Sequence, residues 1–171
     1  MKITVCTPTF NEKENIRELY SKIKDIFKKL DYDYEHLVID NNSSDGTIKI
    51  LKEIASEDKN FKVIINSKNY GHIKSPFHGL LQSDSDATIL MASDFQDPIE
   101  LIPKYIEEWE RGSKIVLGKK NNSEENKLIF SLRSFFYKFL NSISESDLTV
   151  NTTGSGIFDK KVIEKLKKIN D

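Results

Sequence analysis

Short apolar runs alternate along the chain with longer stretches in which apolar residues recur every three or four positions. The short runs predict buried strands at residues 2–7, 36–39, 61–65, 88–91 and 115–117. The periodic stretches predict helices at residues 16–30, 48–54, 76–81 and 98–111. Because strands and helices alternate, and the strands are uninterrupted apolar runs, we expect an α/β fold. Its sheet is expected to be mostly parallel and covered by helices on both faces.

The pattern weakens after residue 118. It predicts a polar loop at 119–126, an aromatic-rich helix at 128–140, a strand at 154–158 and a helix at 160–169. A chain of 171 residues suits one hydrophobic core. We therefore expect residues 1–171 to form a single domain.

Composition narrows the possible partners. Lys and Arg number 26 against 27 Asp and Glu, so a net charge of -1 gives no general attraction for nucleic acid or anionic lipid. The single cysteine, Cys6, excludes an internal disulfide or a cysteine zinc cluster and favours a reduced, cytoplasmic setting and a core position. His36, His72 and His78 lack metal-ligand spacing, and His36 is expected to hold a core or edge position in its strand. No apolar segment has the length of a signal peptide or a membrane span, so we expect a soluble chain.

Polar segments follow three predicted strands, at residues 8–12, 40–46 and 93–97. Ligands bind beyond the carboxyl ends of parallel strands, so these loops predict the binding site. Asp40 is a candidate for holding a nucleobase, because a carboxylate accepts the N–H donors of uracil or guanine. For Asp45, capping of the following helix is as good an explanation as a role in ligand binding.

Asp94, Gln96 and Asp97 gather where the fourth strand meets a helix that Pro98 is expected to open. Mg²⁺ prefers oxygen ligands and commonly uses one or two carboxylates plus substrate phosphates, which predicts a metal diphosphate site. In the alternative, Asp97 caps the helix and Asp94 is a solvated turn residue. The Asp-X-Asp sequence at 84–86 precedes its strand, so it is expected at the opposite end of the sheet.

Residues 68–72 form a further candidate loop. Gly71 allows a phosphate or sugar to approach the backbone closely, but an ordinary turn needs the same residue types. The loop therefore gains meaning only beside the other segments.

Four segments taken in order, residues 7–12, 38–47, 69–71 and 94–100, resemble family 2 glycosyltransferases. The resemblance extends from Ile3 to about Leu166. It is closest to the branch of dolichyl-phosphate mannose synthase and bacterial polyprenyl-phosphate glycosyltransferases. It implies a GT-A fold, a UDP- or GDP-linked sugar donor, Mg²⁺ or Mn²⁺, and inversion at the anomeric carbon.

The resemblance also implies roles for individual residues. Asp94 would bind the metal, and Gln96 and Asp97 would face the sugar, so these three form the candidate catalytic set. The residues implied to bind the nucleotide are Pro8, Thr9, Asn11, Glu12, Asp40, Asn69 and Gly71. Arg133 matches an Arg in an aromatic helix that lies near the acceptor in relatives, although a solvated Arg on a core helix explains it equally well.

The sequence departs from the family pattern at three places. Ala92 stands where many relatives carry the first Asp of an Asp-X-Asp motif, so Asp94 is expected to be the principal protein ligand of the metal. Asn41 replaces the second Asp of the usual Val-Asp-Asp sequence. Residues 153–159 lack the acidic and basic residues that this branch often carries there.

Three functions are compatible with these residues. The first is sugar transfer to a polyprenyl phosphate, which is largely deprotonated at neutral pH and needs no general base. The second is transfer to a sugar hydroxyl of a surface polysaccharide, with Asp97 as a candidate base. The third, suggested by Ala92, is noncatalytic binding of a nucleotide sugar. Because relatives usually continue into amphipathic and membrane helices, we expect a truncated chain whose full-length form associates with the cytoplasmic face of a membrane.

Overall fold

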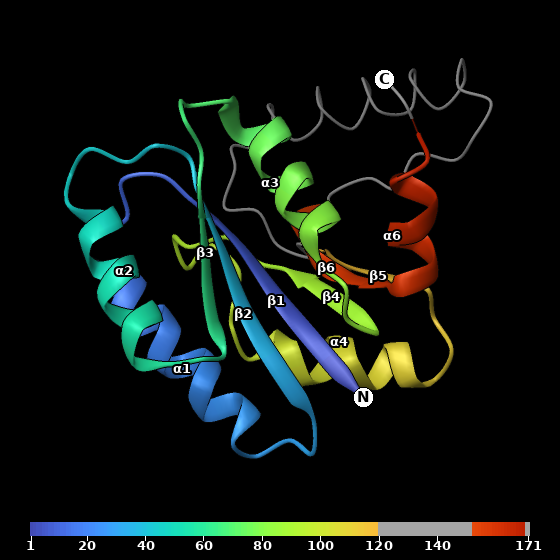
Figure 1. Cartoon of the computed structure of the whole chain (residues 1–171). Coiled ribbons are helices and arrows are strands. Elements are labelled where there is room, and N and C mark those ends of the chain that lie inside the picture. The colour runs from blue at the N-terminus through green and yellow to red at the C-terminus, as the bar shows by residue number, and fades with distance from the viewer. Residues whose placement is uncertain (120–151, 170–171) are drawn as a thin grey trace, which may run out of the picture. The chain divides into compact units, whose positions relative to one another are not determined.

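The computed structural model describes residues 1–119 and 152–169 (Figure 1). The chain divides into one compact unit of residues 1–117 and 154–171 and a second of residues 118–153. Arg133, the predicted helix at 128–140 and nearly all of the polar loop at 119–126 lie outside the described residues. The expectation of a single domain stays a prediction.

Six strands of the described residues form one sheet in the order β3-β2-β1-β4-β6-β5. They are β1 (Lys2–Thr9), β2 (Asp33–Asp40), β3 (Phe61–Ile65), β4 (Ala87–Leu90), β5 (Ile115–Lys119) and β6 (Thr152–Asp159). β1 pairs in parallel with β2 and β4, and β2 with β3, whereas β4 and β6 are antiparallel. The predicted α/β fold with a mostly parallel sheet is confirmed.

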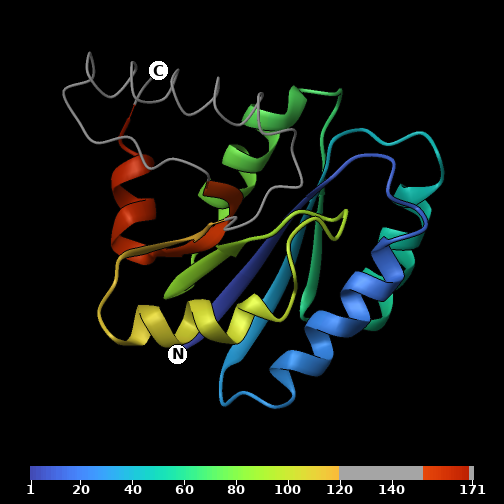
Figure 2. The same ribbon diagram turned by 180° about the vertical axis from the view of Figure 1, so that it is seen from behind.

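Helices cover both faces of this sheet (Figures 1 and 2). They are α1 (Ile16–Phe27), α2 (Thr47–Glu57), α3 (Gly71–Gln82), α4 (Leu101–Glu110) and α6 (Lys160–Leu166). The larger apolar cluster joins side chains of α1, α2 and α4 to the sheet residues Ile3, Val5 and Ile89. A smaller cluster, Cys6, Leu37 and Ile39, lies on the face that α3 covers. None of the described helices is long and apolar enough to cross a membrane.

Two helix starts differ from the prediction. α3 begins at Gly71, five residues before the predicted start at Pro76, because Gly71 adopts a φ of 84° and Pro76 is accommodated inside the helix. α4 begins at Leu101 rather than Pro98. Its start is delayed because the Pro98 carbonyl accepts the Leu101 N–H in a preceding turn.

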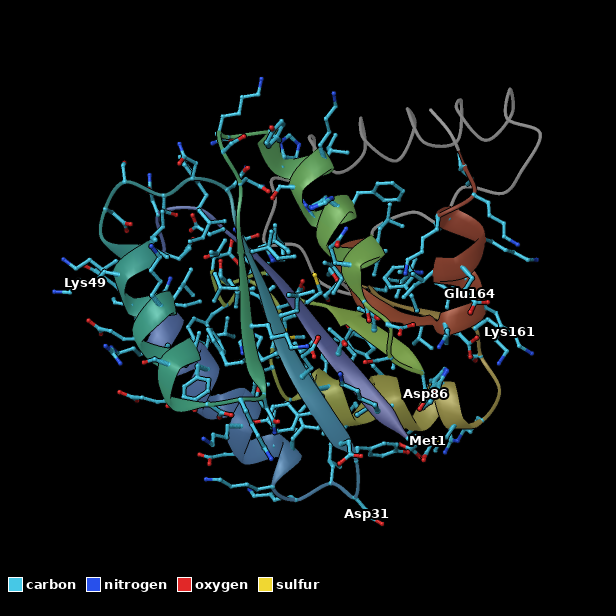
Figure 3. The ribbon with its side chains drawn as sticks, viewed as in Figure 1. Met1, Asp31, Lys49, Asp86, Lys161 and Glu164 are labelled. Carbon is cyan, nitrogen blue, oxygen red and sulfur yellow. The ribbon has the colours of Figure 1, made fainter. Side chains whose placement is uncertain are left out.

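The core assignments of His36 and Cys6 are confirmed. His36 Nε2 lies 3.0 Å from Thr7 Oγ1, and burial lowers the pKa of His36 to about 3, so the ring is neutral at pH 7. Burial also raises the pKa of the Cys6 thiol to about 12. Asp86 exchanges hydrogen bonds with Lys2 at the amino end of β1 (Figure 3), so the Asp-X-Asp sequence lies at the opposite end of the sheet, as predicted.

α3 packs unusually close to the sheet at Gly79. A Cβ added there would lie 2.4 Å from Ile39 Cγ1 and 2.8 Å from Cys6 Sγ. Both distances are far below normal van der Waals contact. The glycine therefore fixes how closely the C-terminal half of α3 approaches β1 and β2.

We expect Gly79→Ala to lower the free energy of unfolding by about 1 to 3 kcal/mol, because the added methyl overpacks this contact. Urea denaturation measures the change. Gly154→Ala is the control: apart from its chain neighbours, no atom of the described residues lies within 4 Å of its added carbon, and a change within about 0.5 kcal/mol is expected. Wild-type stability of Gly79→Ala would contradict the close packing.

Candidate functional site

The loops that follow β1, β2 and β4 meet at one edge of the sheet. Each contains one residue other than glycine in the left-handed region: Asn11 at φ 57°, Asn42 at 66° and Phe95 at 58°. This conformation is uncommon, and for a bulky side chain such as Phe it is strained. Strained backbone of this kind clusters at ligand sites, so its presence in all three loops directs attention to this edge.

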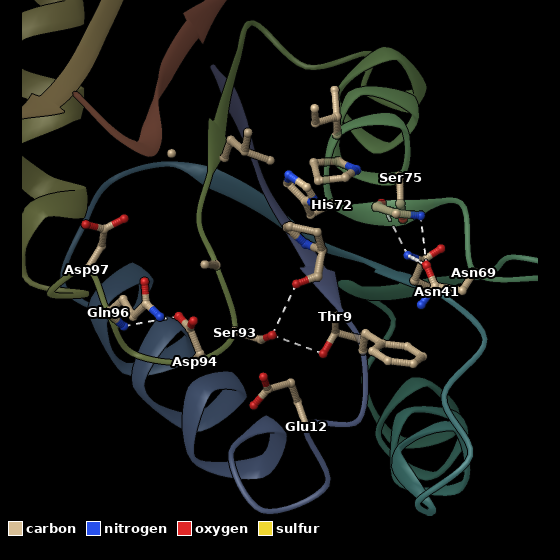
Figure 4. Close-up of a pocket in the computed structure, with 18 residues that line it drawn as sticks. Thr9, Glu12, Asn41, Asn69, His72, Ser75, Ser93, Asp94, Gln96 and Asp97 are labelled. Carbon is tan, nitrogen blue, oxygen red and sulfur yellow. Dashed lines mark hydrogen bonds between the residues drawn. The ribbon is translucent and has the colours of Figure 1, made fainter. Parts of the chain in front are cut away.

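A cavity of about 760 Å³ opens between these loops and the start of α3 (Figure 4). Its volume lies within the range of small-molecule sites. The structure brings eight of the predicted site residues to its wall: Pro8, Thr9, Glu12, Asn69, Gly71, Asp94, Gln96 and Asp97. The cavity sits beside β1, where the chain winds through β2 and β3 on one side and crosses to β4 on the other. Such a switch point is where open parallel sheets bind ligands.

Three carboxylates line this cavity. Asp94 is exposed and accepts the Gln96 N–H at Oδ1 (3.1 Å), while Glu12 Oε2 accepts a hydrogen bond from Asn15 Nδ2 (2.7 Å). Asp97 is 8% exposed. Within the described chain it carries no hydrogen bond or ion pair.

Asp97 does not cap the following helix. The N-cap of α4 is Glu100, and it makes no side-chain capping bond. The capping alternative for Asp97 is therefore wrong, and its carboxylate is placed at the cavity wall instead. The exposed turn position of Asp94 agrees with both its predicted metal role and a solvated turn.

Two predicted nucleotide ligands, Asp40 and Asn11, do not line the cavity. Asp40 is fully buried, and its two carboxylate oxygens accept the backbone N–H and the hydroxyl of Ser43 at 2.9 and 2.6 Å. Asn11 joins the first two loops: its N–H donates to Ser43 Oγ, and its Oδ1 accepts the Ser44 N–H. Both side chains thus shape the loop junction, and direct contact of either with a base stays a prediction.

Asp45 is not the N-cap residue of α2, which is Gly46, but its side chain bonds the first turn of this helix. Its Oδ1 accepts the Thr47 N–H at the start of α2, and its Oδ2 accepts the Lys13 N–H. The carboxylate therefore ties the α2 start to the loop after β1.

Sequence reasoning missed the importance of Ser93 and Asn41. Ser93 Oγ accepts from Thr9 Oγ1 and donates to the Pro8 carbonyl, both at 3.1 Å, and so joins the ends of β1 and β4 (Figure 4). Its position directly after a buried strand was the only signal.

Asn41 uses both ends of its amide to hold the loop before α3. Its Nδ2 donates to Asn69 Oδ1 and the Gly71 carbonyl, and its Oδ1 accepts from the Tyr70 N–H and Asn66 Nδ2. An aspartate could accept here but could not donate. The family's usual Asp is thus replaced by a side chain whose amide hydrogens bond the 66–71 loop.

The cavity wall is acidic overall. Among its described residues are Glu12, Asp94 and Asp97, but no Lys or Arg, and His72 is its one ionisable nitrogen side chain. A diphosphate would meet repulsion there unless a cation accompanied it. No group of three or more His, Cys, Asp or Glu is arranged as a metal cage in the described part of the chain. The donor set fits a cation that a single carboxylate anchors and that ligand phosphates and water complete.

Solved structures with a similar fold include several in complex with UDP or a nucleotide sugar. Glucosyl-3-phosphoglycerate synthase from Mycobacterium tuberculosis, solved with UDP, aligns with a TM-score of 0.66 at 20% identity, over 94% of this chain and 57% of its own. The mannosyltransferase PcManGT from Pyrobaculum calidifontis, in complex with GDP-Man and Mn²⁺, aligns at 0.60 and 19% identity, over 96% and 46%. These likenesses establish the GT-A fold.

Curated relatives similar in sequence are also named as glycosyl transferases. Bactoprenol glucosyl transferase of Shigella phage SfX is 32% identical over 98% of this chain and 55% of its own length, and the prophage bactoprenol glucosyl transferase homolog of Escherichia coli K12 matches equally. The chain thus spans about half the length of these relatives. The model of glycosyl transferase family 2 matches residues 4–167. With the acidic cavity at the strand ends and the family model covering nearly its whole length, the chain belongs to glycosyl transferase family 2.

Proposed function

We propose that this chain is the donor-binding and catalytic part of a metal-dependent, inverting glycosyltransferase that moves a sugar from a nucleoside diphosphate sugar to a polyprenyl phosphate. The observation that carries the proposal is the acidic cavity at the strand ends of a family 2 chain. Relatives named bactoprenol glucosyl transferase support the lipid acceptor. Neighbours solved with UDP or GDP-Man support a UDP- or GDP-linked donor.

The metal proposal rests on the charge of the cavity. Glu12, Asp94 and Asp97 would repel a diphosphate, whereas Mg²⁺ or Mn²⁺ would link one to the protein. Asp94 is the proposed ligand because it is exposed and only its Oδ1 is hydrogen-bonded within the described residues. Ala92 supplies no second carboxylate. When bound, the cation supplies stabilisation of the negative charge on the departing nucleoside diphosphate.

The remaining wall residues bind and orient the donor. Pro8, Thr9 and Glu12 are proposed to contact the nucleoside, and Asn69 and Gly71 the phosphates or sugar. Gln96 and Asp97 are proposed to face the sugar from the opposite wall (Figure 4). Asp40 and Asn11 support the nucleoside loop through their bonds to residues 43 and 44.

The acceptor determines whether a general base is needed. A phosphate monoester, with a second pKa of about 6, is largely ionised at neutral pH and attacks without help. A sugar hydroxyl would need a base, and Asp97 at the cavity wall keeps that alternative open. Arg133 is the proposed partner of a lipid phosphate, outside the described residues. The proposed reaction takes place at the cytoplasmic face of a membrane.

Asp94→Asn is expected to lower metal-dependent turnover roughly 100-fold, because the amide removes the anchoring charge. The measurement is release of UDP or GDP from its sugar donor, with and without Mn²⁺. Asp84→Asn is the control, because Asp84 is an exposed carboxylate at the other end of the sheet. Full Mn²⁺-dependent turnover in Asp94→Asn would contradict the assignment, and its absence in the wild type would favour a noncatalytic binder.

Asn41→Asp is expected to weaken nucleotide binding about tenfold, equivalent to about 1.4 kcal/mol. The carboxylate would face Asn69 Oδ1 and the Gly71 carbonyl with no hydrogen to donate. Titration calorimetry with UDP and GDP in the presence of Mn²⁺ measures the change. Asn42→Asp, one residue away and exposed, makes the same chemical change and is expected to bind as the wild type does. Equal affinities of the two variants would show that the hydrogen bonds of Asn41 do not shape the nucleotide site.

Asp97→Asn separates the two acceptor classes. With a polyprenyl phosphate acceptor the variant is expected to keep turnover within about tenfold, because no base is required, whereas loss of a general base costs about 100-fold or more. Sugar transfer to each acceptor class is measured alongside donor affinity. If the lipid-phosphate reaction collapses while donor and metal binding persist, the base-free reaction is wrong.

A further inference from the structure

Helix α3 places its small residues against the sheet and its large apolar residues outward. Ser75 and Gly79 are buried, whereas Ile73 is 71% exposed and Phe77 is 44% exposed. Residues four positions apart lie side by side on a helix, so Ile73 and Phe77 form one exposed apolar stripe. A surface helix normally turns such a stripe toward the core. This exposed stripe indicates a contact with something other than water.

Two further exposed apolar groups lie close to Lys74 of α3. Ile65, at the end of the edge strand β3, and Tyr70, just before α3, are both exposed. Between them and the helix lies a second cavity of about 450 Å³, whose wall includes Ile65, Tyr70 and Lys74. We call Ile65, Lys68, Tyr70, Ile73, Lys74 and Phe77 the α3 surface. Exposed apolar groups that gather around one element mark interaction sites.

The charge of this region is one-sided. Residues 59–83 contain no Asp or Glu, although the whole chain of 171 residues contains 27. Lys68 Nζ lies 5.3 Å from the ring centroid of Tyr70, and neither Lys68 nor Lys74 forms an ion pair within the described residues. Among the described residues that line the second cavity, none is acidic. The α3 surface is therefore both apolar and cationic, and it suits an anionic partner with an apolar interior.

We propose that the α3 surface is the part of this chain that rests on an anionic lipid membrane. Ile73 and Phe77 enter the boundary between headgroups and acyl chains, as the apolar face of an interfacial helix does. Lys68 and Lys74 contact lipid phosphates, and each such lysine strengthens binding about fivefold. The partner class rests on the proposed function, because a polyprenyl phosphate acceptor is presented by a membrane.

The position of α3 connects this surface to the site. His72 and Ile73 line the acidic cavity, and Tyr70 and Lys74 line the second cavity one helical turn or less away. A membrane against α3 thus places lipid phosphates beside the wall of the proposed donor cavity. A second copy of the chain is a poorer occupant, because pairing two such surfaces brings four lysines together, and lysine is depleted in protein interfaces.

The test is co-sedimentation of the 171-residue chain with vesicles of phosphatidylcholine, alone or mixed with phosphatidylglycerol. Binding is expected for the mixed vesicles and weakens as salt is added. The double variant Lys68→Gln with Lys74→Gln is expected to lower the partition coefficient roughly 25-fold. Phe77→Ser lowers it several-fold through lost apolar burial.

Matched controls lie elsewhere on the molecule. The double variant Lys49→Gln with Lys52→Gln removes two positive charges from α2, as many as the Lys68 and Lys74 variant removes (Figure 3 labels Lys49). Ile115→Ser removes an exposed apolar side chain on β5. Both are expected to bind vesicles as the wild type does. Equal losses in the α2 and α3 double variants, or no binding of the wild type to mixed vesicles, would overturn the proposal.

Two other occupants give distinct results that also overturn it. A concentration-dependent dimer that Phe77→Ser disrupts, without vesicle binding, would identify a second copy. A lower melting temperature of Phe77→Ser with unchanged vesicle binding would identify an intramolecular contact.

Sugar transfer to polyprenyl phosphate in detergent without vesicle binding rejects only the membrane surface. Vesicle binding through α3 without any such transfer rejects only the proposed function.

Discussion

The parallel pairing of β1 with both β2 and β4 is the constraint on which the site depends. Thr9 is in register with Asp40, and Cys6 with Leu90, so the three strands end at one edge and deliver their loops to one place. Hydrogen bonds of Ser93 and Asn11 then join the loops to one another. The cavity follows from this arrangement, because the chain reverses its winding direction at β1.

The same edge shows what a sequence can and cannot predict. The strands, the fold class and the wall positions of Asp94 and Asp97 follow from apolar periodicity and from polar residues at strand ends. The role of Asp40 in its turn does not, because the bond to Ser43 depends on loop geometry that periodicity does not encode. The hydrogen bonds of Asn41 were not predicted because its partners lie 25 to 30 positions away. α3 was predicted too short because Pro76 suggested a helix start.

A net charge of -1 conceals a marked separation of charge. The cavity wall carries Glu12, Asp94 and Asp97 without a Lys or Arg among its described residues, whereas α3 lies within the acid-free segment 59–83. An acidic cavity favours a cation and its diphosphate, and a basic apolar helix favours a membrane. In the proposed reaction the donor and the acceptor therefore meet where these two regions adjoin, at the start of α3.

The central claim is that Asp94 anchors the metal of a nucleotide-sugar donor. The most direct test is a crystal structure of this chain with Mn²⁺ and UDP or GDP. The account predicts nucleotide in the 760 Å³ cavity and metal at about 2.0 to 2.6 Å from an Asp94 carboxylate oxygen, bridging to the diphosphate. Nucleotide bound in this cavity with no metal at Asp94, or metal held at Asp84 and Asp86, would contradict it.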